Sequence, residues 1–311
     1  MVAIFSSSRK PGWLAVLCRD GRITLAAGRR LGRRAEISLL ESFADDGDVR
    51  AALARLRAAR RFASYRCVTL MNDGGYQITP LDAPSVPREE RREALRWSLR
   101  GRVDYPVETA CLAVLDVPGD GAPGRAAGVL VVSADERAVV SVAAPFEDAR
   151  VPLDAIDVPE LAQRNVAALL EDENRGLVLL CLNEAGSLLT LTYRGELVAA
   201  RRGEIGVRQM LSSDADEAAR GRERVVLELQ RSLDNFDRQY SHVPVSKVVL
   251  AVSPRVDGLI GELAENVYVP VQEMNLASVM DFPKTPELRD PAAQAANLLA
   301  IGAALRAEDA A

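Results

Sequence analysis

The sequence predicts an α/β protein made of two related core domains, with a smaller α+β block inserted between them. Two observations support this fold class. A three-strand meander is expected within residues 177–203, and a shorter version of the same pattern occupies residues 12–27. Between them, residues 81–150 mix strand and helix patterns, which is typical of a compact insertion. The repeated meander therefore indicates two halves of similar architecture.

The later meander is the clearer of the two. Residues 177–182 form a short, continuous apolar run, as expected for a strand buried on both faces. Strands at 187–193 and 197–200 follow it, each after a turn signal. In the earlier copy, apolar residues 12–18 lead into an Arg19-Asp20-Gly21 turn, and a second strand starts at Arg22. Aspartate followed by glycine is a common hairpin turn, so a β-hairpin is the expected local structure.

The remaining patterns place helices and strands along the chain. The expected helices cover 48–61, 85–102, 134–146, 159–171, 214–240, 259–265 and 292–306. Further strands are expected at 67–71, 76–81, 109–117, 126–133, 155–158 and 246–252. This order predicts a first core domain of residues 1–81 with 151–174, an inserted subdomain of residues 82–150, and a second core domain of residues 175–311.

Composition excludes several classes of function. The chain has 311 residues and a net charge of −5, so no global positive field favours nucleic acid. No apolar run approaches the roughly 20 residues that span a bilayer, and no signal-peptide pattern opens the chain, so a cytoplasmic protein without direct membrane insertion is expected. The single histidine, His242, disfavours histidine-based metal sites. The four cysteines are widely spaced in apolar runs, which is typical of buried thiols.

Four local segments, taken in order, resemble a known family. They are residues 83–106, 153–169 and 177–206, and the ending Asn297–Arg306 with its Ile-Gly-x-Ala-x-Arg pattern. Each is similar to a segment of the PilM/MshI family of type IV pilus biogenesis proteins, MshI serving the MSHA pilus. The resemblance implies the actin-like (ribonuclease H-like) two-domain fold with an inserted α+β subdomain.

The resemblance also implies where a nucleotide site would lie. In the family, two Asp-x-Gly loops bind Mg²⁺ and phosphate, and paired glycines approach the adenosine. Here no Asp-x-Gly follows the first strand, since Asp20-Gly21 suits a hairpin turn. The second loop has Cys181 in place of the acid, and a thiol is a poor Mg²⁺ ligand. The six positions expected to form a degenerate site are Asp20, Gly21, Cys181, Asn183, Ala251 and Val252.

Loss of all three nucleotide elements favours a scaffold without ATPase activity. The protein would then belong to the inner-membrane platform of an MSHA-like type IV pilus, with no bound cofactor. The alternative is a divergent PilM-like protein that binds or hydrolyses Mg·ATP, which requires an acidic residue beside glycines in the central cleft. A sugar-kinase-like enzyme of the same superfold is a further alternative, and it too needs a catalytic acid.

The resemblance implies a protein partner as well. The family binds the short cytoplasmic N-terminal peptide of a PilN-like bitopic inner-membrane protein, between the first core domain and the inserted subdomain. This partner, with other platform components, would bring the chain to the inner face of the membrane. We expect a groove bordered by residues 71–81 and the helix at 88–102. The candidate contact residues are Met71, Tyr76, Trp97, Arg100 and Tyr105, although Trp97 and Tyr105 also suit a subdomain core.

Overall fold

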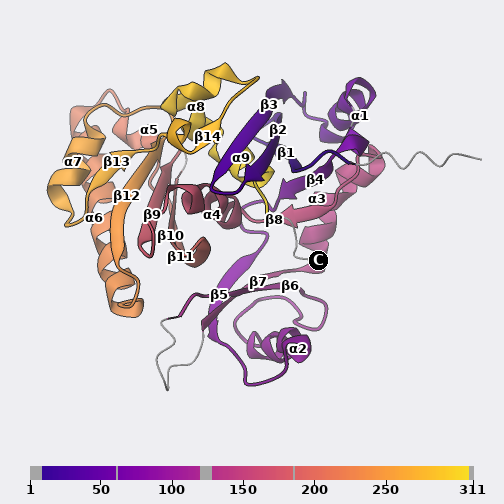
Figure 1. The fold of residues 1–311 in the computed structure, drawn as a ribbon, viewed down its shortest axis with the longest axis horizontal. Coiled ribbons are helices and arrows are strands. Elements are labelled where there is room, and N and C mark those ends of the chain that lie inside the picture. Colours follow the sequence, from indigo (N-terminus) through magenta and orange to yellow (C-terminus); the bar gives the residue numbers. More distant parts are fainter. Residues whose placement is uncertain (1–8, 61, 120–127, 185, 308–311) are drawn as a thin grey trace, which may run out of the picture.

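The structure is a computed structural model that describes residues 9–60, 62–119, 128–184 and 186–307. In these residues the strands form sheets of six, five and three strands. Figure 1 shows the two larger sheets on either side of helices α4 (Pro159–Leu170) and α9 (Leu298–Ala304), with the three-stranded sheet below. We call the six-stranded sheet and its helices the first lobe, and the five-stranded sheet and its helices the second lobe.

The first lobe is built on an antiparallel meander that continues into parallel strands. Its strand order is β14-β3-β2-β1-β4-β8. The strands are β1 (Trp13–Arg19), β2 (Arg22–Leu31), β3 (Arg34–Ala44), β4 (Arg66–Leu70), β8 (Ala155–Asp157) and β14 (Met280–Asp281). Helices α1 (Val49–Ala59) and α3 (Glu136–Asp148) contribute to the core on one face, whereas α4 and α9 cover the other face. The lobe also contains the short helix η1 (Phe62–Ser64).

Alternation along β1 explains its continuous apolar run. Leu14 and Val16 pack into the core beside α1, whereas Trp13 and Leu17 pack into the core beside α4 and α9. Successive side chains of a strand point to opposite faces, so a strand covered on both sides needs apolar residues at every position.

The second lobe repeats the same topology. Its strand order is β11-β10-β9-β12-β13, which matches β3-β2-β1-β4-β8 of the first lobe. The strands are β9 (Gly176–Leu182), β10 (Ser187–Tyr193), β11 (Glu196–Gly203), β12 (Val245–Val252) and β13 (Val271–Glu273). Helices α5 (Val207–Met210), α6 (Ala215–Gln239) and α7 (Leu259–Asn266) form the core of the outer face. The expected relation between the two halves is therefore confirmed.

The three-stranded sheet forms the insertion. Its order is β5-β7-β6, from β5 (Gln77–Asp82), β6 (Cys111–Asp116) and β7 (Gly128–Ala134), and helix α2 (Arg88–Ser98) covers one face. Sequence analysis grouped β5 with the first core domain and α3 with the insertion. In the structure β5 pairs with β7, whereas α3 packs on both units, with Val139 and Val142 against the β7 side of the insertion and Phe146 in the core of the first lobe. The pairing of β5 favours an insertion that begins before β5, and we propose the domain boundaries on that basis.

Several elements differ from the sequence prediction. Strands β3 and β14 were not predicted, and α2 ends at Ser98 rather than near residue 102. The expected C-terminal helix is divided at Asn297 into α8 (Pro291–Ala296) and α9, because the Asn297 side-chain amide donates to the carbonyl of Ala293 and caps α8. Short helices η2 (Leu276–Ser278) and η3 (Pro286–Arg289) precede α8. Within the described ranges, no helix is both long and apolar enough to span a membrane.

Candidate functional site

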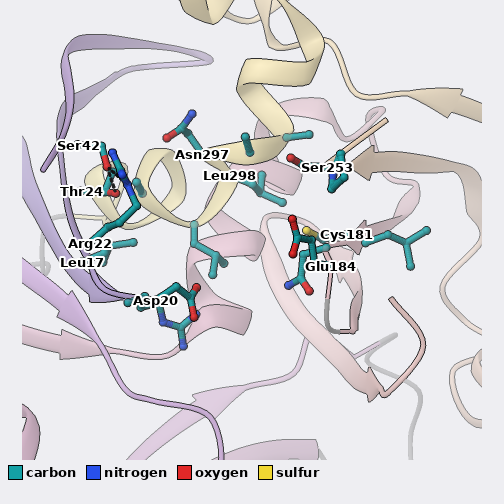
Figure 2. A pocket seen from close by; sticks show the side chains of 18 of the residues that line it. Leu17, Asp20, Arg22, Thr24, Ser42, Cys181, Glu184, Ser253, Asn297 and Leu298 are labelled. Carbon is teal, nitrogen blue, oxygen red and sulfur yellow. Dashed lines mark hydrogen bonds between the residues drawn. The ribbon is translucent and has the colours of Figure 1, made fainter. Parts of the chain in front are cut away.

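A cleft of about 930 Å³ lies between the two lobes. It is lined by the β1–β2 hairpin, the β9–β10 hairpin, the end of β12, and helices α8 and α9. Figure 2 shows Arg22, Thr24 and Ser42 on the first-lobe side, with Cys181, Glu184 and Ser253 on the opposite side. Equivalent hairpins of the two halves therefore lie on opposite sides of one cleft.

The first hairpin turns tightly at Asp20 and Gly21. Both residues have positive φ angles, 51° and 71°, between the last paired residues Arg19 and Arg22. This is the geometry of a two-residue turn that matches the twist of the strands, so the predicted hairpin is confirmed. Asp20 lines the cleft. Across the strands, the Arg22 guanidinium donates to the Ser42 hydroxyl at 2.9 Å.

The second hairpin uses Asn183 to stabilise its own turn. The Asn183 side-chain oxygen accepts a hydrogen bond from the backbone N–H of Gly186 at 2.9 Å, and its backbone carbonyl accepts from Val207 at 2.8 Å. Cys181 lines the cleft two residues earlier. Burial raises the pKa of the Cys181 thiol to about 12. The thiol is therefore neutral near pH 7 and supplies no negative charge to a cation.

The other two expected positions lie beside the cleft rather than in it. Ala251 is 1% exposed and packs in the core, and Val252 packs partly on the outer core of the second lobe. Both are residues of β12, and the cleft lining begins after them, at Ser253 and Pro254. The strand ends at residue 252, as the sequence predicted. Ala251 and Val252 pair with Cys181 and Leu182 of β9.

Acidic residues do reach the cleft, and two of the three pair with arginines. Asp20, Asp73 and Glu184 line it, together with Arg19, Arg22 and Arg208. One Asp73 oxygen is 3.2 Å from Arg19 and 2.6 Å from Arg202, and Glu184 is 3.8 Å from Arg208. Among the described residues, no group of three or more acidic, cysteine or histidine side chains is arranged to bind a metal ion.

Sequence reasoning missed Asp73 and the arginines. The order Asp73-Gly74-Gly75 does fit Asp-x-Gly, which is a signal that could have found it. It follows β4, however, rather than the first strand of either meander, where such loops were sought. The sequence placed Arg19 in a turn and predicted no partner for it, because Met71 and Asp73 lie more than 50 positions away.

The partner-contact candidates divide between two faces of the three-stranded sheet. Met71 and Tyr76 pack with Leu130 and Val132 of β7 on the face toward the lobes. Val129 and Val131 point the other way, toward α2, which carries Trp97, and Arg100 follows two residues after the end of this helix. Leu81, at the other end of the expected border of residues 71–81, packs on the α2 side with Leu95 and Leu99. A groove between residues 71–81 and 88–102 therefore stays a prediction, and Met71 and Tyr76 lie on the opposite face of the sheet from α2.

Trp97 and Arg100 are the two exposed residues among the five candidates. Trp97 is 49% exposed, and the Arg100 guanidinium lies 4.7 Å from its ring centre. Arg100 also pairs with Glu108 at 3.1 Å. Tyr105 is half-buried on the same side of the sheet, and its hydroxyl donates to Ser133 at 2.8 Å. By contrast, Met71 is only 4% exposed.

No protein-family model and no curated protein matches this sequence. Among solved structures, the chain is similar to a "PilM-PilN type IV pilus biogenesis complex", with 19% identity over 94% of this chain and 97% of that chain and a TM-score of 0.74. Two further structures match with lower TM-scores. One is a Bacteroides thetaiotaomicron protein of unknown function with an actin-like ATPase fold (11% identity, 95% and 98% covered, TM-score 0.46). The other is the cytoplasmic domain of EpsL, an inner-membrane component of the type II secretion system of Vibrio cholerae (12%, 91% and 94%, 0.45).

At such identities a likeness concerns the fold rather than the activity. The match at TM-score 0.74 covers nearly the whole of both chains, so it includes both lobes and the insertion. The repeated strand order of the two lobes agrees with it. The predicted fold class is thus confirmed, and this chain has the actin-like fold in the arrangement seen in the PilM–PilN structure.

Proposed function

We propose that this chain is a cytoplasmic scaffold in the inner-membrane platform of a type IV pilus of the MSHA kind. It binds the cytoplasmic N-terminal peptide of a PilN-like bitopic membrane protein, and through that partner it associates with the membrane and with other platform components. The observation that carries this proposal is the match over 94% of the chain to a PilM–PilN complex. The MSHA assignment rests on the sequence resemblance alone.

The chemistry of the cleft supports a scaffold without ATPase activity. Mg²⁺ prefers oxygen ligands and usually binds phosphates together with one or two carboxylates. Here Cys181 is a neutral thiol, and the carboxylate of Asp73 is paired with two arginines. A nucleotide phosphate would therefore meet a neutral thiol at the second loop and an arginine-paired carboxylate at Asp73. We therefore assign the cleft a structural role.

We place the peptide site on the side of the insertion that carries Trp97, Arg100 and Tyr105. Large aromatic side chains and arginines dominate binding hot spots, and Trp97 is half exposed with an arginine stacked on it. Tyr105 extends this surface toward β7 through its bond to Ser133. Met71 and Tyr76 support the insertion from its other face, so they affect the site indirectly.

A titration of the partner peptide tests the proposal. A synthetic peptide with the N-terminal cytoplasmic sequence of a PilN-like protein from the same organism is added to wild type and to Trp97→Ala, with binding measured by calorimetry. Loss of a hot-spot aromatic costs at least about 2 kcal/mol, so the Kd should rise by more than about tenfold.

The matched control is Tyr268→Ala, which removes an aromatic that is 66% exposed on the second lobe. Its Kd should equal that of wild type. If Trp97→Ala folds and binds as tightly as wild type, the site is elsewhere. If wild type binds no PilN-like peptide, the proposed function is wrong.

The alternative is a divergent PilM-like protein that binds or hydrolyses Mg·ATP. The size of the cleft and the position of Asp20 beside Gly21 favour it, because glycine lets a backbone N–H approach a phosphate. This alternative requires nucleotide binding to the free protein, whereas the scaffold does not.

A further inference from the structure

Glu160 is a buried carboxylate that joins separate parts of the molecule. It is the second residue of α4 and only 3% exposed. One of its oxygens accepts a hydrogen bond from the Arg202 guanidinium at 2.8 Å, and the other accepts from the Tyr76 hydroxyl. Arg202 belongs to β11 of the second lobe, whereas Tyr76 lies between β4 of the first lobe and β5 of the insertion. The three structural units thus meet at one side chain.

Arg202 makes two further contacts with the segment that links the first lobe to the insertion. Its guanidinium donates to Asp73 at 2.6 Å and to the Tyr76 hydroxyl, and it lies 5.5 Å from the centre of the Tyr76 ring. We call Arg202, Glu160, Tyr76 and Asp73 the interlobe cluster. Each of the three guanidinium nitrogens donates to a partner outside its own lobe, which favours one relative position of the two lobes.

The interlobe cluster also reaches the cleft. Asp73 accepts a second hydrogen bond from Arg19 at 3.2 Å, and the same Arg19 nitrogen donates to the Met71 carbonyl at 3.2 Å. Arg19 is the last residue of β1, next to the turn at Asp20 that lines the cleft. A continuous set of polar contacts therefore runs from the first cleft hairpin, through residues 71–76, to β11.

Electrostatic interactions stabilise the contacts of the interlobe cluster. Burial lowers the pKa of the Arg202 guanidinium, but its hydrogen bond and charge interaction with Glu160 outweigh burial and raise the pKa overall. Burial and the Glu160 charge raise the pKa of Tyr76, so the phenol stays protonated and donates. Without Arg202, Glu160 would be a buried charge without a cationic partner, which is strongly unfavourable.

We propose that Arg202 is an interlobe latch that fixes the relative position of the lobes and couples the cleft hairpin to residues 71–76 at the entry to the insertion. The latch is a property of the free protein. Its effect on partner binding rests on the proposed function, because the insertion carries the proposed peptide site. In this arrangement the Arg202 side chain joins the two lobes across one end of the cleft.

Hydrogen–deuterium exchange of the full chain tests the latch. Arg202→Met removes the charge and keeps much of the side-chain length. Exchange of amides in residues 19–22 and 71–76 should become at least about tenfold faster, because these segments lose the contacts that hold them. The matched control is Arg201→Met, which changes the neighbouring exposed arginine of β11. It should exchange like wild type in both segments.

A second variant keeps the test decisive if Arg202→Met does not fold. Asp73→Asn removes a carboxylate that is mostly exposed and leaves the Arg202–Glu160 pair intact. It should speed exchange at residues 19–22, where Arg19 loses its ion pair, while α6 stays unchanged. Unchanged exchange at residues 19–22 in Asp73→Asn, or equal exchange in folded Arg202→Met and Arg201→Met, would overturn the latch.

Peptide titration separates the latch from the proposed function. If both are right, Arg202→Met weakens binding of the PilN-like peptide severalfold and Arg201→Met does not. If wild type binds no peptide, the proposed function fails, whereas the exchange comparison still decides whether the latch exists.

Discussion

Burial determines the protonation of cysteine thiols in both lobes. Cys67 is fully buried in β4, and desolvation, with a smaller contribution from Asp154, raises its pKa to about 12 from an ordinary value of 9.0. The folded protein therefore binds this proton more tightly than the unfolded chain does. The resulting stability is fully present below pH 9 and is lost as pH rises toward 12.

The variant Cys67→Ala tests this dependence of stability on pH. The difference in unfolding free energy between wild type and Cys67→Ala should be constant up to about pH 8.5. Above that, wild type should lose stability relative to the variant by up to about 1.4 kcal/mol per pH unit. Urea unfolding of both proteins from pH 7 to pH 10.5 measures the difference. If the unfolding free energies of the two proteins keep a constant difference over this range, burial does not hold the Cys67 thiol in its protonated form.

Helices α4 and α9 cross at close range between the two larger sheets. A β-carbon at Gly302 would lie 2.0 Å from the carbonyl oxygen of Ala162, and the Asn165 amide donates to the Gly302 carbonyl at 2.9 Å. At the end of the same segment, Arg306 pairs with the buried Asp157 at 2.8 Å. These contacts give the Ile-Gly-x-Ala-x-Arg pattern a structural meaning, since its glycine permits the crossing and its arginine pairs with Asp157 at the end of β8.

Gly302→Ala should destabilise the protein, because the two helix backbones must separate to admit the methyl group. The expected loss is about 1–3 kcal/mol, measured by urea unfolding. Gly261→Ala is the control, since Gly261 lies in α7 with no atom within 4 Å of its added β-carbon. The control should be as stable as wild type or slightly more stable. Equal stability of the two variants would mean that the crossing tolerates a wider spacing.

The sequence predicted those elements whose formation depends on local pattern. β9 and β1 were recognisable because both of their faces are buried, which leaves a continuous apolar run. β14 has only two residues and exists through its pairing with β3, more than 200 positions away, so no local signal predicts it. The interlobe cluster was not predicted from the sequence for the same reason. Glu160 lies 42 residues from Arg202 and 84 from Tyr76, and only the fold brings them together.

At the scale of the whole molecule, the two lobes enclose a cleft, and ion pairs join them beside it. Arg19 and Arg202 contact Asp73, which lines the cleft, and Arg202 also contacts Glu160. Cys181 in the cleft is a neutral thiol. The central claim is that this actin-like protein keeps its lobes together without Mg·ATP. The claim applies to the free protein, so it can be tested without a partner.

A thermal-unfolding titration with Mg·ATP tests this claim most directly. A ligand that binds only the folded state stabilises it by about 2.7 kcal/mol when present at 100 times its Kd, which raises the Tm measurably. We predict no change in Tm at millimolar Mg·ATP, either for wild type or for Cys181→Asp, whose other cleft positions remain unchanged. A Tm that rises with Mg·ATP concentration, needs Mg²⁺, and no longer rises in Asp20→Asn would contradict the claim and favour the divergent nucleotide-binding protein.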